Sequence, residues 1–286
     1  MWLNLWVLPL LAADLLTDFR PSPIQSPYGV TTQVEFSTRL AELESGALAH
    51  HLAGTMKNFR FDEKVWVLAY KTSIVDERGA VPKENYLCHT FFADQHVDQH
   101  PENELKGIYS DAFTPEVKLP EGFGIPMLPG ENLHWMPMFN NRGEIPVRVA
   151  MKVVLTMIRD RDLRKPLKAV HASLRSVQVP HLFFVPPGHD ERQISFELPF
   201  NGRIHFLGTH IHPYGTSIEL YNLSRKERVW IGKRQGGPYS PMDTYSSVEG
   251  YPVHSGETYR ITSVYDNPMK SKADAMAGLF MLYSRE

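Results

Sequence analysis

The chain has 286 residues, of which 42% are hydrophobic and 22% charged, with a formal net charge of −2 at pH 7. This length predicts one large or two medium domains with a substantial core. The near-neutral charge, without a local Lys/Arg cluster, argues against a nucleic-acid-binding surface. The single cysteine, Cys88, excludes an intramolecular disulfide framework. The 13 histidines and 11 methionines leave room for a site that binds a soft metal ion.

Residues 1–16 are almost wholly apolar, and no Lys or Arg precedes Arg20, so the basic start of a secretory signal peptide is missing. The run is shorter than the ~20 residues of a membrane-spanning helix, while Trp2 and Trp6 suit the membrane–water interface. We therefore expect residues 1–20 to be a membrane-associating segment that docks on a membrane or a membrane protein complex, on the extracytoplasmic (periplasmic) side. The alternatives are a signal peptide with an unusual start, a segment buried against a partner, and the first strand of a globular domain.

Residues 21–62 are expected to form a linker with one short helical stretch. Three prolines within residues 21–27 are incompatible with a helix or the interior of a sheet. The helical stretch is expected over residues 39–52.

The rest of the chain carries the signals of short strands separated by turns, with β-branched and aromatic residues between Gly, Pro, Asn and Asp clusters. A charged, irregular stretch over residues 160–168 is expected to separate two halves. The predicted fold class is all-β, with two tandem antiparallel β-sandwich (jelly-roll-like) domains over residues 63–160 and 168–286. The expected strands span residues 65–75, 86–92, 133–139, 146–159, 173–179, 182–185, 193–198, 204–212, 217–222, 228–233, 258–265 and 277–283.

A His-x-His pair, His210 and His212, lies in one of these expected strands. Because side chains alternate along a strand, both imidazoles should point to the same face, roughly 6–7 Å apart at the backbone. The same alternation should turn His205 to the opposite face. Two imidazoles on one face can bind one metal ion, and a thioether from the carboxy-terminal strand would make the site suit copper, Cu(I) in particular. Two histidines that only hydrogen-bond inside a sandwich are the alternative.

Three motifs in the second half resemble the second domain of the type II copper, ascorbate-dependent monooxygenases, the peptidylglycine α-hydroxylating and dopamine β-hydroxylating enzymes. These motifs are His210-Ile211-His212, Tyr265-Asp266-Asn267-Pro268, and Met276 followed by Leu279, Met281 and Tyr283. The resemblance implies two tandem β-sandwich domains that each hold one copper, with His210, His212 and Met276 as the ligands of the copper that binds O₂. It also implies ascorbate or another reductant, and a small-molecule or peptide substrate.

The first half resembles the family's first domain at residues 87–92 and 119–124, but its expected copper site is incomplete. Cys88-His89 stands where the family has two adjacent histidines, and Met138 stands where the third histidine would fall. His134 lies in the same expected strand as Met138. Weaker candidates for a first site are therefore His89, His134 and Met138, with Cys88, His96 and His100 as alternative ligands, so that one copper is expected and a second is doubtful.

Three functions remain open from the sequence. The first is a copper-dependent enzyme that hydroxylates an activated C–H bond with O₂. The second is a non-catalytic structural or accessory subunit that keeps the fold and at most one copper while docked on a membrane or membrane protein complex. The third is a copper carrier that uses the His/Met site for storage.

Overall fold

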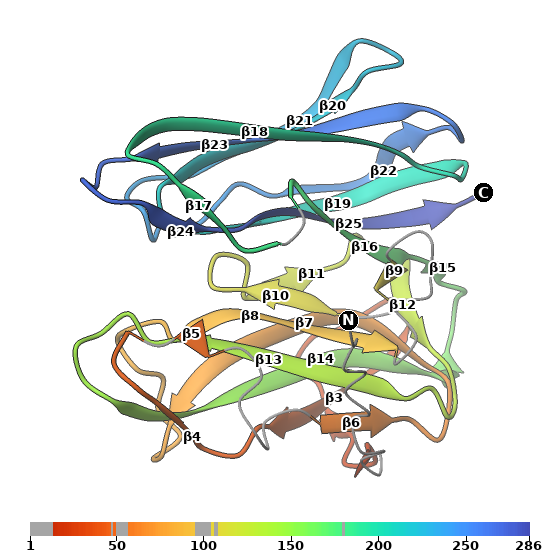
Figure 1. The fold of residues 1–286 in the computed structure, drawn as a ribbon. Coiled ribbons are helices and arrows are strands. Elements are labelled where there is room, and N and C mark those ends of the chain that lie inside the picture. Colours follow the sequence, from red (N-terminus) through yellow and green to blue (C-terminus); the bar gives the residue numbers. More distant parts are fainter. Residues whose placement is uncertain (1–13, 47, 50–56, 95–103, 106–107, 179–180) are drawn as a thin grey trace, which may run out of the picture.

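The computed structural model describes residues 14–46, 48–49, 57–94, 104–105, 108–178 and 181–286, and within these ranges the protein is all-β, with no helix (Figure 1). The strands, β1 to β25, form five sheets arranged in two groups, one above the other in Figure 1. Within the described ranges there is accordingly no apolar helix long enough to cross a membrane.

The lower group in Figure 1 contains two sheets. Sheet 1 consists of β1 (Asp14–Leu15), β6 (Lys57–Arg60), β13 (Leu133–Asn140), β8 (Leu87–Asp94) and β10 (Tyr109–Asp111) in that order, with β5 (Leu48–Ala49) paired to β13. Sheet 2 consists of β15 (Lys168–Ala169), β12 (Phe123–Met127), β7 (Val65–Asp76), β14 (Val147–Leu163), β3 (Gly29–Ser37) and β2 (Arg20–Pro21), with β11 (Glu116–Lys118) paired to β7 and β4 (Ala41–Leu43) paired to β14.

The upper group contains the other three sheets. Sheet 3 consists of β22 (Tyr245–Val253), β19 (Gly202–Ile211), β25 (Ala277–Arg285), β16 (His171–Ser176) and β9 (Glu104–Leu105). Sheet 4 consists of β18 (Gly188–Glu197), β23 (Thr258–Asn267), β20 (Gly215–Asn222) and β21 (Glu227–Lys233). Sheet 5 is the pair β17 (Phe183–Val185) and β24 (Ala273–Ala275).

Aromatic side chains fill the space between sheets 1 and 2. Phe36 of β3 lies edge-on to Trp135 of β13, with ring centroids 5.2 Å apart, and Trp135 stacks on Phe92 of β8 at 5.8 Å. All three belong to one continuous buried cluster. Such contacts between large rings contribute both buried apolar area and favourable ring geometry.

The central strands of sheet 3, β19 and β25, are buried on both faces, and this joins the two groups of sheets. Phe206 of β19 and Phe280 of β25 belong to the lower core, whereas Leu207 and Leu279, their neighbours in sequence, belong to the core between sheets 3 and 4. Phe280 stacks on Tyr109 of β10 with ring centroids 5.0 Å apart. The contact holds sheet 1 against sheet 3, and the side chains discussed below lie along this junction.

The helical stretch expected over residues 39–52 is wrong for the part of it that the structure describes. Ala41 and Leu43 are buried and Glu42 between them is exposed, which is the alternation of a strand, and β4 pairs with β14. Leu48 and Ala49 form β5, and residues 50–52 lie outside the described ranges. Residues 29–37 of the expected linker form β3, which pairs with β14.

Candidate metal centre between two sheets

His210 lies at the end of β19 and His212 directly follows the strand, and the structure brings their rings together. The ring centroids are 5.2 Å apart, and the two residues are 4% and 3% exposed. The buried Cys88 of β8, in the other group of sheets, completes the cluster. One donor atom from each of Cys88, His210 and His212 lies within 4.8 Å of the other two.

A tight turn and one arginine fix the position of His212. The His212–Gly215 turn has Pro213 at its second position and Tyr214, with φ of 70°, at its third, and the Gly215 amide donates to the His212 carbonyl at 3.1 Å. This is the pattern of a type II turn. Arg234 donates to the carbonyls of Gly215 at 2.6 Å and His212 at 3.1 Å. The chain after β19 is therefore held from two sides.

A carboxylate contacts each imidazole at Nδ1. Asp111 Oδ2 lies 3.3 Å from His210 Nδ1, and Asp274 Oδ2 lies 2.7 Å from His212 Nδ1. A carboxylate accepts the proton of Nδ1, so each ring presents the lone pair of Nε2 on its far side. The Nε2 of His212 is buried and has no hydrogen-bond partner among the described residues. Imidazoles held by carboxylates in this way are typical of metal ligands.

The acidic groups of the centre differ in their electrostatic surroundings. Burial raises the pKa of Asp111 to about 7, although the amides of Phe113 and Thr114 donate hydrogen bonds that oppose the rise. Burial also raises the pKa of the Cys88 thiol to about 12. The hydrogen bond from His212, together with the charge of Arg142, lowers the pKa of Asp274 to about 2 despite its partial burial. Burial thus disfavours the ionised forms of Asp111 and Cys88 unless a positive charge lies beside them.

The weaker first-site candidates do not all come together. His89 is buried, its Nδ1 lies 3.3 Å from Cys88 Sγ, and its ring centroid lies 4.5 Å from that of His210. Met138 lies directly opposite His89 on the neighbouring strand β13. His134 pairs in register with Ala93, four residues along β8 from His89, which is about 13 Å away along the strand. The Nδ1 of His134 contacts Asn58 at 2.6 Å. The alternatives His96 and His100 lie outside the described residues.

Met276 lies between β24 and β25, beside the centre. Its carbonyl accepts hydrogen bonds from the His212 amide at 3.0 Å and from the Tyr265 hydroxyl at 2.7 Å. These contacts place the Met276 backbone next to His212. The role of its sulfur as a ligand stays a prediction.

A cavity of about 390 Å³ opens onto the centre. Its wall includes the three clustered residues Cys88, His210 and His212. Arg142 and the 61%-exposed Tyr239 line the side toward solvent. The cavity therefore lies directly beside the three clustered residues.

The sequence did not reveal that Cys88 lies beside the His-x-His pair, nor that Asp111 and Asp274 contact its rings. Asp274 stands two residues before Met276, and this proximity was an available signal for a role in the same site. Nothing in the local pattern distinguished Asp111 from the other acidic residues of the chain, because its contact with His210 joins residues 99 positions apart.

Comparison with known proteins identifies no family. No family model matches the chain, and no curated protein matches it. Among solved structures, the major capsid protein P2 of bacteriophage PM2 matches with 11% identity and a TM-score of 0.38, over 86% of this chain and 99% of that one. A structure from Sulfolobus turreted icosahedral virus matches with 10% identity and a TM-score of 0.34, over 86% and 91% of the two chains. The PBCV-1 VP54 structure fitted into the virophage Sputnik matches with 9% identity and a TM-score of 0.32, over 92% and 95%.

The expected membership of the type II copper monooxygenase family is therefore wrong. No family model matches the chain, and the three solved structures named above are of viral proteins. The expected role as a copper protein that hydroxylates C–H bonds, and the oxidoreductase class with it, is wrong for the same reason. The short motifs His210-Ile211-His212 and Met276 did not suffice to identify the family.

Proposed function

We propose that the protein binds one zinc ion through Cys88, His210 and His212, and that this ion holds two tandem antiparallel β-sandwich units together. The observation that carries the proposal is the convergence of three buried donor atoms within 4.8 Å of one another. Cys88 comes from sheet 1, and the two histidines come from the end of β19 in sheet 3. An ion bound to all three would therefore be a cross-link between the two groups of sheets.

The donor set favours zinc on chemical grounds. One thiolate and two imidazoles are N and S ligands of the kind that zinc takes in tetrahedral sites. Zinc binds them at about 2.0–2.3 Å, which places neighbouring donors about 3.5 Å apart. Donors that already lie within 4.8 Å reach this spacing by small side-chain rotations. A zinc ion also supplies the positive charge that a buried thiolate needs. Cu(I) accepts the same ligands and is the competing ion.

The order Asp111, His210, Cys88 also matches the acid–base–nucleophile arrangement of thiol hydrolases. A reactive cysteine needs a lowered pKa and a partly exposed sulfur. Cys88 is only 4% exposed, and burial raises the pKa of its thiol. A second imidazole, from His212, converges on the same point, and the thiol hydrolase arrangement has no use for it. The metal site is therefore the better account of the cluster.

The test is titration of the metal-free, reduced protein with zinc. We expect one ion per chain, a higher melting temperature with zinc, and protection of Cys88 from alkylation by iodoacetamide. Cys88→Ser and His212→Ala should each lower zinc affinity by at least about tenfold, since each removes one of three ligands. His189→Ala is the matched control, because His189 pairs with Asp266 on the surface, where both side chains are more than 60% exposed.

Two outcomes would overturn the proposal. One is the absence of stoichiometric zinc binding by the wild-type protein. The other is equal zinc affinity in wild type, Cys88→Ser and His212→Ala. A parallel titration with Cu(I) under reducing conditions distinguishes the two ions, and stoichiometric Cu(I) without zinc would replace zinc by copper at the same ligands.

A further inference from the structure

The cavity beside the three clustered residues has the lining of a site for an organic anion. We propose that it binds a small carboxylate with an apolar or aromatic body, whose oxygen takes the fourth coordination position of the metal ion. This inference rests on the proposed metal site and adds a ligand class to it.

The floor carries the metal donors. Cys88, His210 and His212 all line the cavity. Three protein ligands leave one position of a tetrahedral ion open, as in zinc sites that accept water or another ligand. Asp111 and Asp274 contact the two imidazoles at Nδ1. These two contacts do not use the Nε2 atoms, which are the proposed ligands of the ion. The open position can therefore face the cavity.

The walls are mainly apolar. The apolar residues of the lining are Leu87, Phe113 and Pro213, with the aromatic residues Tyr86 and Tyr239 beside them. Leu87 is buried, and Tyr239 is 61% exposed. A volume of about 390 Å³ falls in the range of pockets for small organic molecules and exceeds what a bare inorganic anion would fill. The body of the ligand should therefore be apolar.

Arg142 supplies the one cationic side chain of the lining. Its Nη2 lies 3.3 Å from Asp274 Oδ2, and its side chain is 33% exposed. The side-chain amide of Asn140 turns its oxygen toward Arg142, and this oxygen accepts a hydrogen bond from Nε of Arg142 at 2.7 Å. These contacts fix the guanidinium at the cavity, where its remaining donors suit a carboxylate oxygen. Glu84, on the rim, disfavours a second negative group on the ligand.

The experiment uses the full chain loaded with Co(II), whose visible spectrum reports the ligands of the ion. Benzoate is the probe, and benzamide is the neutral control of nearly the same shape. We expect benzoate to change the Co(II) spectrum saturably and benzamide to leave it unchanged. Arg142→Gln should weaken benzoate binding about tenfold or more, the loss of one charge-assisted contact, while Co(II) still binds one per chain. Arg148→Gln, at an exposed arginine paired with Glu77, should leave benzoate binding unchanged.

The outcomes separate this inference from the proposed function. Failure to bind Co(II), zinc or Cu(I) overturns both. Stoichiometric metal binding with a spectrum that benzoate does not change overturns the carboxylate site and leaves the metal site standing. Equal effects of benzoate and benzamide, or equal benzoate affinity in wild type and Arg142→Gln, also overturn the carboxylate site.

Discussion

Asp274 accepts a hydrogen bond from Nδ1 of His212 at 2.7 Å and lies 3.3 Å from the guanidinium of Arg142. One carboxylate thus links an imidazole of the metal centre to the cation at the mouth of the cavity. The first contact sets the tautomer and orientation of the His212 ring. Both contacts lower the pKa of the Asp274 carboxyl, the hydrogen bond from His212 most, and so keep it negatively charged.

Replacing this charge should weaken metal binding. Asp274→Asn keeps an oxygen that can accept from His212 but removes the charge, and loss of such a supporting carboxylate lowers metal affinity by about 10–100-fold. Zinc affinity measured by competition with a chelator checks this. Asp266→Asn is the matched control, since Asp266 makes the same kind of contact with His189 at 2.9 Å on the surface. Equal zinc affinities in the two variants would show that Asp274 does not support the ligand.

Arg234 should be needed for the stability of the turn that follows His212. Its guanidinium donates to the carbonyls of Gly215, Ile211 and His212 at 2.6–3.1 Å. Arg234→Met leaves these acceptors without their donor, which should reduce the free energy of unfolding by about 2–4 kcal/mol and weaken zinc binding as well. Urea denaturation with and without zinc measures both effects. Arg228→Met, which removes only an exposed ion pair, should cost less than about 1 kcal/mol.

Met276 provides a test of which ion the centre prefers. A thioether is a good ligand for Cu(I) and a poor one for zinc. Met276→Leu should therefore leave zinc affinity within about twofold of wild type and, if the sulfur is a ligand, weaken Cu(I) several-fold. Leucine preserves the apolar volume, so the backbone contact of residue 276 with His212 is kept. A large loss of zinc affinity in Met276→Leu would contradict the three-ligand zinc site.

Strand periodicity predicted the orientation of some histidines in and directly after β19 correctly and of one wrongly. Strand periodicity predicted that His210 and His212 would share a face, and their rings lie 5.2 Å apart. The same reasoning failed for His205, because the pairing register of β19 shifts between Ile204 and Phe206. The His205 ring centroid lies 4.1 Å from that of Phe123, in the lower group of sheets, with the two rings tilted. A bulge adds a residue to one strand and breaks the alternation beyond it, and nothing in the sequence indicates its position.

The all-β class was predictable, whereas the third donor of the centre was not. Strand and turn signals are local, and they recur along both halves of the chain. The approach of Cys88 to His210 depends on how sheet 1 packs against sheet 3 through contacts such as Tyr109 with Phe280. Packing between sheets depends on side chains more than 100 residues apart in sequence, and a single sequence does not specify which of many apolar faces meet.

The amino-terminal segment gives a prediction that follows from the sequence alone. Its apolar residues and the tryptophans Trp2 and Trp6 should bind the interface of a lipid bilayer. The full chain should float with lipid vesicles in a density gradient, and a variant lacking residues 1–13 should remain at the bottom. This deletion retains Asp14–Leu15, which pairs with β6. Flotation of both proteins, or of neither, would contradict membrane attachment through this segment.

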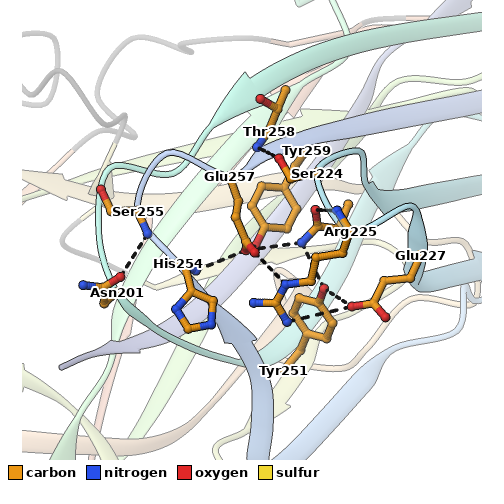
Figure 2. A network of polar contacts seen from close by, with 11 residues as sticks. Asn201, Ser224, Arg225, Glu227, Tyr251, His254, Ser255, Glu257, Thr258 and Tyr259 are labelled. Carbon is orange, nitrogen blue, oxygen red and sulfur yellow. Dashed lines mark hydrogen bonds and ion pairs between the residues drawn. The ribbon is translucent and has the colours of Figure 1, made fainter.

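Glu257 should make stability depend on pH at the acidic end of the range. It accepts hydrogen bonds from Arg225, from the Tyr259 hydroxyl at 2.7 Å and from the His254 amide at 3.2 Å, and Figure 2 shows these contacts converging on its carboxylate. Burial alone would raise the pKa of Glu257, but the hydrogen bonds together outweigh it and lower the pKa. A carboxylate with a lowered pKa in the folded state stabilises the fold above its unfolded pKa of about 4.5, and this contribution is lost as the pH falls through the folded-state value.

Glu257→Gln removes the charge and should cost about 1–2 kcal/mol of the free energy of unfolding at pH 7. The difference in melting temperature between wild type and Glu257→Gln should therefore be largest at neutral pH. It should shrink as the pH falls below 4.5, where Glu257 is protonated first in the unfolded state and, at lower pH, in the folded protein. A difference that stays constant from pH 7 to pH 3 would show that the contribution of Glu257 does not depend on its charge.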